Sequence, residues 1–183
     1  IAAAFDRALK ALQDAGAELV PIELPRDPNL LDLFHRHWFA GAAARLSALS
    51  PADLDAVDPG LREIAVQGAA YSAVDLIQAQ NRRAAFGAAF DMLLEGFDAI
   101  LSPACSVLPF AAGEEVPPGS GLKRWTEWAG FSYPVNLAQA PAAIIRSEIL
   151  HEGLPVGVQI LGPRGEDGRV LSVAAALESL YAA

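Results

Sequence analysis

The sequence predicts an α/β protein in which a mixed sheet is flanked by helices. Segments with apolar residues at helical spacing are intermixed with short runs of strand character, an order that fits the α/β class and also the α+β class. The 183 residues are 53% hydrophobic and 19% charged, which is typical of a globular chain with a substantial core. This length is enough for one domain, so we predict a single domain over 1–183, and no internal repeat is visible. The pattern leaves parallel and mixed strand orders open.

Helices are predicted wherever apolar residues recur every three or four positions. They cover 1–12, 30–49, 61–70, 72–94, a short stretch near Trp125 and Trp128, and a final segment that Asp167 caps. Gly16 predicts the end of the first helix. Ser72 and Asp75 have the spacing of a capping box, with a carboxylate in place of the usual Glu or Gln, and predict the start of the longest helix. The polar stretch 50–60 predicts a break between helices.

Four strands are predicted from short apolar and β-branched runs. They cover 17–24, 97–103, 142–150 and 154–161. Pro21 cannot donate to a ladder, so the first of them is expected at an edge or with a bulge. A turn at His151-Glu152-Gly153 joins the last two. The segment 107–121 is rich in Pro and Gly and predicts a long surface loop, of a kind that is often functional or mobile.

Charge and cysteine content narrow the functional classes. A net charge of −9 argues against a nucleic-acid partner, which needs clustered Lys and Arg to displace counterions. No apolar run is long enough to cross a bilayer, so no membrane partner is predicted. Cys105 is the only cysteine, which excludes an internal disulfide and makes a cytoplasmic location the default expectation. Ile1 is not a methionine and begins within a helical pattern, from which we expect a truncated or cleaved chain.

Residues with catalytic potential do not form a site in the sequence. Serine hydrolysis needs an activated hydroxyl, a base and oxyanion donors, and neither Lys10 nor Lys123 is near a Gly/Ser-rich run. His35 and His37 diverge on a helix and lack the spacing of metal ligands, so no metal site is predicted. Cys105 follows a strand end, where it is either a nucleophile or, without a histidine or cationic neighbour, a small buried thiol.

Several polar and aromatic residues have both a structural and a binding interpretation. Trp125 and Trp128 are three apart, so they either cover a core or stack on a substrate. Asn136 either fixes a turn or contacts a substrate. Gln159 is an amide in an apolar strand and must find partners, so it either ties the sheet to a neighbouring segment or points into a pocket. The adjacent acids at 114–115 are expected to be solvated.

The most informative sequence pattern is the long segment 131–163. The segment 131–163 reads FSYPVNLAQAPAAIIRSEILHEGLPVGVQILGP. It resembles the amidase signature family, serine hydrolases that cleave carboxamide C–N bonds, whose pattern is F-x-x-P-x-N-x-x-G-x-P-A, a short strand, then G-L-P-V-G-x-Q. The matching residues are Phe131, Pro134, Asn136, Pro141, Ala142, Gly153, Leu154, Pro155, Val156, Gly157 and Gln159. Upstream, 98–103 is similar to the family strand D-x-L-L-x-P, and 5–25 and 72–94 are similar to earlier family segments.

The resemblance implies the C-terminal part of an α/β/α sandwich, acyl transfer from an amide to a serine, and no metal or organic cofactor. The family's Ser-Ser-Lys triad lies in a Gly/Ser-rich loop that has no matching positions here, so no catalytic residue is carried over. The resemblance places Trp125, Tyr133 and Asn136 on the substrate side, together with the loop 107–121. The residues to which it gives structural roles are Pro103, Pro141, Gly157 and Gln159.

Three positions depart from the family pattern. Gln139 stands where the family has glycine, and Arg146 and Glu148 stand where Pro and Gly are common. The two charged residues are expected either to pair with each other across a loop or to mark a divergent member.

Three functions fit the resemblance. The favoured one is the C-terminal portion of an amidase-type hydrolase, inactive by itself, whose complete protein takes a small-molecule amide. The second is an A-type subunit of a tRNA-dependent amidotransferase, and the third is a non-enzymatic binding or assembly module on an amidase scaffold. A severed half-sheet leaves unpaired edges and apolar surface, which predicts self-association or a held partner such as the missing N-terminal portion.

Overall fold

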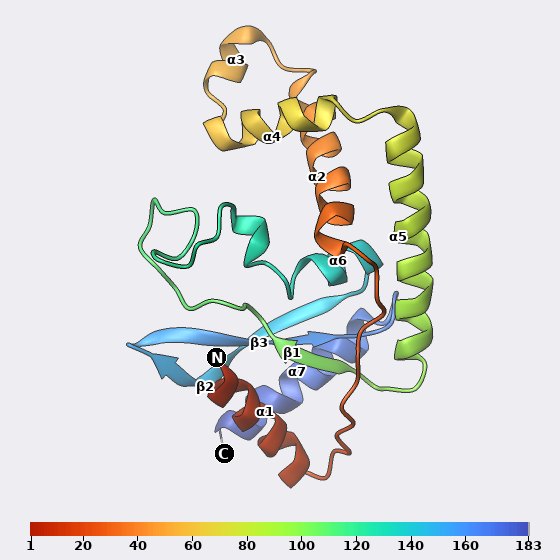
Figure 1. Ribbon diagram of the computed structural model, residues 1–183. Helices are drawn as coiled ribbons and strands as arrows, with labels where there is room; N and C mark the ends of the chain where they lie inside the picture. Colours follow the sequence, from red (N-terminus) through yellow and green to blue (C-terminus); the bar gives the residue numbers. More distant parts are fainter. Residues whose placement is uncertain (183) are drawn as a thin grey trace. The chain divides into compact units, whose positions relative to one another are not determined.

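The computed structural model describes residues 1–182, and the contacts between them divide the chain into two compact units. The larger unit comprises Ile1–Pro25 together with the chain from Gly87 onward, and the smaller is Arg26–Phe86. The longest helix, α5 (Ala73–Leu94), contributes residues to each. The α/β class is confirmed, because the larger unit combines a sheet with flanking helices (Figure 1). The single domain over 1–183 stays a prediction.

The sheet has three strands in the order β1–β3–β2, and both described pairs are antiparallel (Figure 1). The strands are β1 (Ile100–Pro103), β2 (Ala142–His151) and β3 (Leu154–Leu161). β2 and β3 form a hairpin at the predicted turn, where Glu152 and Gly153 have φ values of 52° and 80°. Two successive positive φ angles are typical of the type I′ turn, whose twist matches that of the strands it joins.

Two helices, α1 (Ala2–Asp14) and α7 (Asp167–Ala182), cover one face of this sheet. The alternation of side chains along a strand sends every second residue of β3, and of β2 as far as Arg146, to this face. The buried apolar residues of this core are Ala8, Ala11, Ile145, Val158, Ile160, Val170, Ala174 and Leu177. At the edge of the core Arg7 Nε in α1 lies 2.6 Å from Glu148 Oε2 in β2, so Glu148 pairs with a helix and not with Arg146.

The pairing of β2 with β3 is regular in the first half of β2 and irregular in the second half. It pairs regularly with β3 from Ala142 to Arg146, and the register then shifts before Leu150. The side chain of Ser147, which is 1% exposed, lies within the irregular part. Its Oγ donates to the carbonyl of Ile149 at 2.9 Å and accepts from the Ile149 amide at 3.0 Å. This side chain therefore satisfies backbone groups that the shifted ladder leaves unpaired.

The smaller unit contains α2 (Leu30–Leu46), α3 (Pro51–Asp55), α4 (Pro59–Ala69) and the first part of α5. α2 and α4 pack backbone to backbone, and Gly68 makes this possible. A Cβ on Gly68 would lie 1.9 Å from the carbonyl oxygen of Phe39, closer than any side chain can approach. The sequence predicted both helices but gave no sign of this close approach.

Serines start two helices of this unit. Ser72 Oγ accepts from the Asp75 amide at 3.1 Å, and Asp75 Oδ2 accepts from the Ser72 amide at 3.0 Å, so the predicted capping box is confirmed. Ser50 Oγ accepts from the Asp53 amide at 3.2 Å in the same way. The stretch 50–60, predicted as a polar break, therefore holds the five-residue helix α3.

The strand expected over 17–24 is wrong, because this segment has no regular secondary structure. Pro21 has no amide to donate, and the neighbouring Val20 is 51% exposed. Leu24 is also exposed, at 37%. A short run of apolar residues without a buried face gains too little from burial to hold an extended pairing.

Candidate functional site

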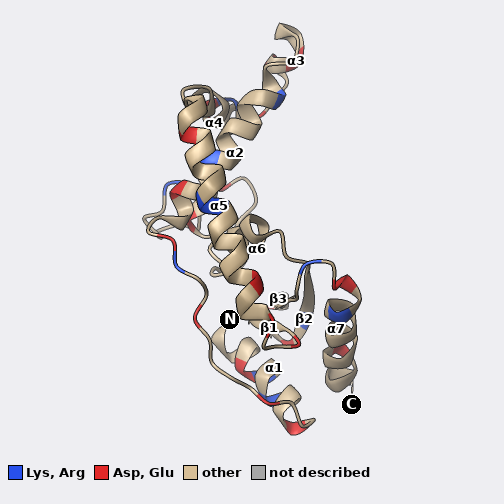
Figure 2. Ribbon diagram, turned by 90° about the vertical axis from the view of Figure 1, so that its right-hand side faces the viewer, with Lys and Arg blue, Asp and Glu red and all other residues tan. Residues whose placement is uncertain are grey.

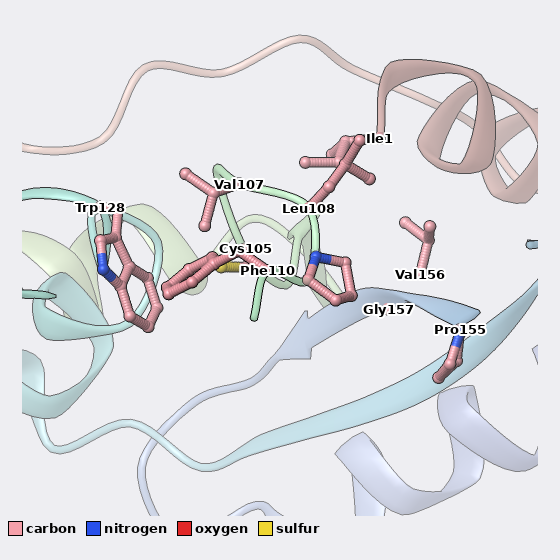
Figure 3. Close-up of a pocket in the computed structure, with 10 residues that line it drawn as sticks. Ile1, Cys105, Val107, Leu108, Phe110, Trp128, Pro155, Val156 and Gly157 are labelled. Carbon is pink, nitrogen blue, oxygen red and sulfur yellow. The ribbon is translucent and has the colours of Figure 1, made fainter. Parts of the chain in front are cut away.

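A cavity of about 220 Å³ lies beside β3, at the point where β1 ends (Figure 3). Pro103 is the last residue of β1 and pairs with Val158. The Ala104 amide then donates to the carbonyl of Gly157 at 3.1 Å, after which the chain leaves the sheet and runs without helix or strand to 124. β3 extends further than β1 does, and the departing chain folds over its uncovered part. The predicted loop 107–121 lies within this stretch.

The lining of the cavity is mostly apolar and comes from four parts of the chain, namely Ile1, the stretch 105–110, Trp128 and the stretch 155–157. Figure 3 shows side chains of the departing chain facing β3 residues across the cavity, with the indole of Trp128 at one end. Its side chains include those of Cys105, Val107, Leu108, Phe110, Trp128 and Val156. A concave, mostly apolar surface of this kind suits the apolar part of a small molecule.

The aromatic end of the cavity is held by contacts on both sides of Trp128. The ring of Phe110 meets the indole edge to face, with centroids 5.9 Å apart and planes at 83°. Trp128 Nε1 donates to the carbonyl of Glu115 at 3.0 Å, and Ser106 Oγ donates to the carbonyl of Trp128 at 2.5 Å. These contacts fix the position of the loop against the aromatic residue.

Carboxylates hold the short 3₁₀ helix η1 (Trp125–Glu127) at its start. Glu127 Oε2 accepts from the amide of Lys123 at 2.5 Å and from that of Arg124 at 3.1 Å. Glu115 Oε1 accepts from the amide of Trp125 at 3.3 Å. Glu115 therefore bonds to the backbone of η1, and both Glu114 and Glu115 are exposed, as the sequence predicted.

Gln159 joins the sheet to the segment before α6 (Tyr133–Ala138). Its side chain is buried, with the residue 4% exposed. Nε2 donates to Ser102 Oγ in β1 and to the carbonyl of Phe131, each at 3.0 Å. A buried amide needs such partners, because an unsatisfied one costs about 1–3 kcal/mol. The sequence left open whether Gln159 ties the sheet to a neighbouring segment or points into a pocket. These two hydrogen bonds connect the sheet to a neighbouring segment.

The other residues that were assigned structural roles lie at tight points of the sheet. A Cβ on Gly157 would lie 2.9 Å from both Ala104 Cβ and Ile144 Cγ2, so only glycine fits there without a shift. The carbonyl of Pro141 accepts from the Gly162 amide at 3.1 Å, which closes the end of the hairpin.

Trp125, Tyr133 and Asn136 were the predicted substrate-side residues, and none of the three is among the described residues that line the cavity. Trp125 lies in η1, and both others lie in α6. Asn136 is exposed, and its Nδ2 donates to the carbonyl of Ser132 at 2.9 Å. Tyr133 is half-buried, and burial raises the pKa of its phenol. Their contact with a substrate stays a prediction.

Among the described side chains that line the cavity there is one thiol and no basic group. Cys105 is unpaired and half-buried at its wall, and no His, Lys or Arg is among the described lining residues. Lys10 pairs with Asp14 on α1, with Nζ and Oδ2 2.9 Å apart. Within residues 1–182, no group of three His, Cys, Asp or Glu side chains could hold a metal ion. No helix in this part of the chain has the length and apolar character to cross a bilayer.

The predicted pocket-side loop 107–121 contributes residues 107–110 to the cavity, but the sequence analysis did not single these residues out. Val107, Leu108 and Phe110 are three large apolar residues at the start of a stretch otherwise rich in Pro, Gly and acids. Such a cluster in a loop needs apolar cover, and this was the available signal. The β3 residues that line the cavity, 155–157, were not predictable from the sequence. They are available to the loop because β1 pairs with β3 only over 158–161.

Known proteins resemble this chain over almost its whole length. A family model described as Amidase matches residues 1–171. The 2-amino-5-chloromuconic acid deaminase of Comamonas testosteroni is 24% identical over 194 residues, which cover 98% of this chain and 39% of the deaminase. An amidase crystal structure superposes with a TM-score of 0.84 at 29% identity and covers 96% of this chain and 41% of its own.

A third relative comes from another functional class. The A-type subunit of glutamyl-tRNA(Gln) amidotransferase from Thermotoga maritima superposes with a TM-score of 0.66 at 28% identity, covering 97% of this chain and 38% of its own. The chain thus spans about two-fifths of the length of these relatives. With a family model matched from residue 1 to residue 171, the chain belongs to the amidase family.

Proposed function

We propose that this chain is the C-terminal part of an amidase-type hydrolase, which cleaves carboxamide C–N bonds through an acyl-serine intermediate. The observation that carries the proposal is the family match over 1–171 in a chain two-fifths as long as its relatives. The 183 residues contain no Gly/Ser-rich loop with an accompanying lysine. The Ser-Ser-Lys triad therefore belongs to polypeptide outside this chain, which by itself is inactive.

The role of this chain in the reaction is to bind and position the substrate. We assign the apolar cavity beside β3 to the apolar part of a small amide, with Trp128 and Phe110 at its aromatic end. Trp125, Tyr133 and Asn136 remain our proposed polar and aromatic contacts near it. No metal or organic cofactor is assigned, and we keep a cytoplasmic location as part of the proposal.

The test is an assay of the purified chain against a panel of aliphatic and aryl amides. We expect no turnover by the chain alone, and turnover when the polypeptide encoded upstream of it is supplied. Mass spectrometry during turnover is expected to find the acyl group on a serine of that upstream polypeptide. Turnover by the chain alone that survives Lys10→Ala and Lys123→Ala would defeat the proposal.

An A-type subunit of a tRNA-dependent amidotransferase is the second candidate. The Thermotoga maritima amidotransferase structure supports it, at nearly the same identity as the amidase. The TM-score of 0.84 with the amidase against 0.66 with the amidotransferase favours the hydrolase. Stable co-purification with amidotransferase partner subunits would reverse that order. A non-enzymatic module would be favoured instead if the natural gene lacked a Ser-Ser-Lys region.

A further inference from the structure

Glu115 connects the loop 107–121 to both tryptophans that follow it. Its carbonyl accepts from Trp128 Nε1 at 3.0 Å, and its carboxylate Oε1 accepts from the Trp125 amide at 3.3 Å. Trp128 lines the cavity, whereas none of the described residues from 111 to 121 does. Glu115 therefore acts on the cavity through Trp128 and not by contact with a bound molecule.

The part of the loop that carries Glu115 has little other support. Residues 111–115 are all exposed, and the chain forms no helix or strand between β1 and η1. Gly113, two positions before Glu115, has a φ of 93°. Glycine adopts positive and negative φ almost equally well, so the backbone beside Glu115 can change conformation at little cost. The two hydrogen bonds of Glu115 therefore carry a large share of what keeps the loop against Trp128.

The cavity has room for an uncharged group of about the size of one ring. Its volume is about 220 Å³, and an apolar cavity of about 150 Å³ is enough to hold benzene. None of the described lining residues is Asp, Glu, Lys, Arg or His, so a charged group would lose its hydration without gaining a partner. The indole N–H already donates to Glu115, which leaves the ring of Trp128 for contact with a ligand.

We propose that Glu115 is the positioning residue of this cavity, and that the cavity selects amides carrying one uncharged ring, aryl or cycloalkyl, beside Trp128. This inference rests on the proposed function, because it narrows the class of amide that the site takes. Phe110 and Trp128 already meet edge to face, so a ring in the cavity extends an existing aromatic cluster (Figure 3). Release of the loop at Glu115 lets Phe110 and Leu108 move away from that ring.

Alkylation of Cys105 tests the selectivity, because Cys105 lies at the cavity wall and is the only cysteine of the 183 residues. Its rate of reaction with iodoacetamide is followed by mass spectrometry, in the chain and in the chain joined to the polypeptide encoded upstream of it. We expect acetanilide to slow the reaction in a saturable way. The matched probe para-acetamidobenzoate, which adds a carboxylate to the same ring, is expected to bind at least about tenfold more weakly. Equal protection by the two probes overturns the proposed selectivity.

Two neighbouring acids supply matched variants for the positioning role. Glu115→Ala removes the carboxylate that accepts from the Trp125 amide, whereas the side chain of Glu114, also exposed, makes no described hydrogen bond. We expect Glu115→Ala to weaken acetanilide binding and to speed alkylation, each by about fivefold, and Glu114→Ala to change neither by more than about twofold. Glu115→Gln should restore both values, because its amide oxygen accepts the same bond. Equal effects of the two alanine variants overturn the positioning role.

The bond to the indole is tested by Trp128→Phe, which keeps an aromatic ring but has no N–H for the carbonyl of Glu115. Ligand-observed NMR measures acetanilide binding in every variant without use of the thiol, so the test does not depend on the reactivity of Cys105. Because both bonds fasten one loop, the double variant with Glu115→Ala is expected to lose less than the product of the two single losses. A full product would show independent effects and contradict a shared loop.

The two proposals can fail separately. In an active assembly Glu115→Ala is expected to raise KM for acetanilide while kcat stays within about twofold, since Glu115 does not touch the reacting atoms. Turnover with an unchanged KM in that variant would refute only the role of Glu115. Selective binding that depends on Glu115, in an assembly that cleaves no amide, would refute only the proposed function.

Discussion

Gln139 ends α6 in a backbone conformation that favours glycine, with φ 58° and ψ 31°. A residue with a Cβ costs about 1–2 kcal/mol in this left-handed region. We expect Gln139→Gly to raise the free energy of unfolding by about 1 kcal/mol, as measured by urea denaturation. Ala140→Gly is the control, because Ala140 lies outside the left-handed region, and it is expected to lower stability by roughly 0.5–1 kcal/mol. A loss in both variants would contradict the explanation.

Gly157 is required by close packing and not by its backbone angles. A methyl group there would press on Ala104 and Ile144 at 2.9 Å. We expect Gly157→Ala to lower the free energy of unfolding by about 1–3 kcal/mol because the two neighbours must shift. Gly168→Ala, in α7 with nothing within 4 Å of the added Cβ, should instead stabilise the protein by about 0.5–1 kcal/mol. Thermal unfolding of the two variants gives shifts of opposite sign if this is correct.

At the scale of elements, ion pairs connect three segments of the smaller unit, and Figure 2 colours their acidic and basic positions. Arg82 of α5 lies 2.5 Å from Asp27, which precedes α2, and 3.2 Å from Asp32 in α2. Arg36 lies 2.9 Å from Asp32 and 3.4 Å from Asp75. A connected set of this kind orders the entry to α2 against α5 better than isolated surface pairs would.

These contacts predict that acid weakens the smaller unit. The hydrogen bond from Arg82 lowers the pKa of Asp27. Burial raises the pKa of Asp32, but hydrogen bonds from Arg36 and Arg82 outweigh it and the net pKa is lowered. A lowered carboxyl pKa contributes stability that is present above the unfolded value of about 3.9 and is lost as the pH falls through the folded value.

We therefore expect the free energy of unfolding to fall as the pH drops below about 4, and Arg82→Met to flatten that fall. Denaturant unfolding followed at a series of pH values measures both. Arg62→Met is the control, because Arg62 only approaches Asp55, at 3.8 Å, and the side chain of Asp55 is 87% exposed. An identical pH profile for the Arg82→Met variant and the natural sequence would rule out this source of acid sensitivity.

At the scale of the whole molecule, the negative net charge argues against binding to nucleic acids. The net charge is −9, from 22 acidic and 13 basic residues. Phosphate backbones are bound by neutralising them with Lys and Arg, so we expect no retention of the chain on immobilised tRNA or duplex DNA at about 50 mM salt. Elution in the flow-through at that salt, with a basic RNA-binding protein retained as the control, is the expected result. Retention that decreases steeply with salt would contradict it.

Local patterns were sufficient for much of the fold. The Ser72–Asp75 capping box and the turn at Glu152–Gly153 are confirmed, because each depends on hydrogen bonds or backbone angles within four residues. The strand expected over 17–24 failed because its apolar residues find no buried face, which no local pattern records. The β3 side of the cavity was not predicted for the same reason, since it lies some fifty positions along the chain from the predicted pocket-side loop.

The sequence by itself determined the α/β class, the longer helices, the hairpin and the family pattern, but not the short helices α3 and α6. Periodicity, capping and turn chemistry act between neighbours, which is why these features could be predicted. Only the tertiary structure decided that Glu148 pairs with Arg7, 141 positions away, and that Gln159 bonds to the carbonyl of Phe131. It alone placed the cavity where β1 stops. These features depend on which surfaces come together when apolar area is buried. The free energy of that burial arises from contacts between segments that are distant in the sequence, so no local pattern contains it.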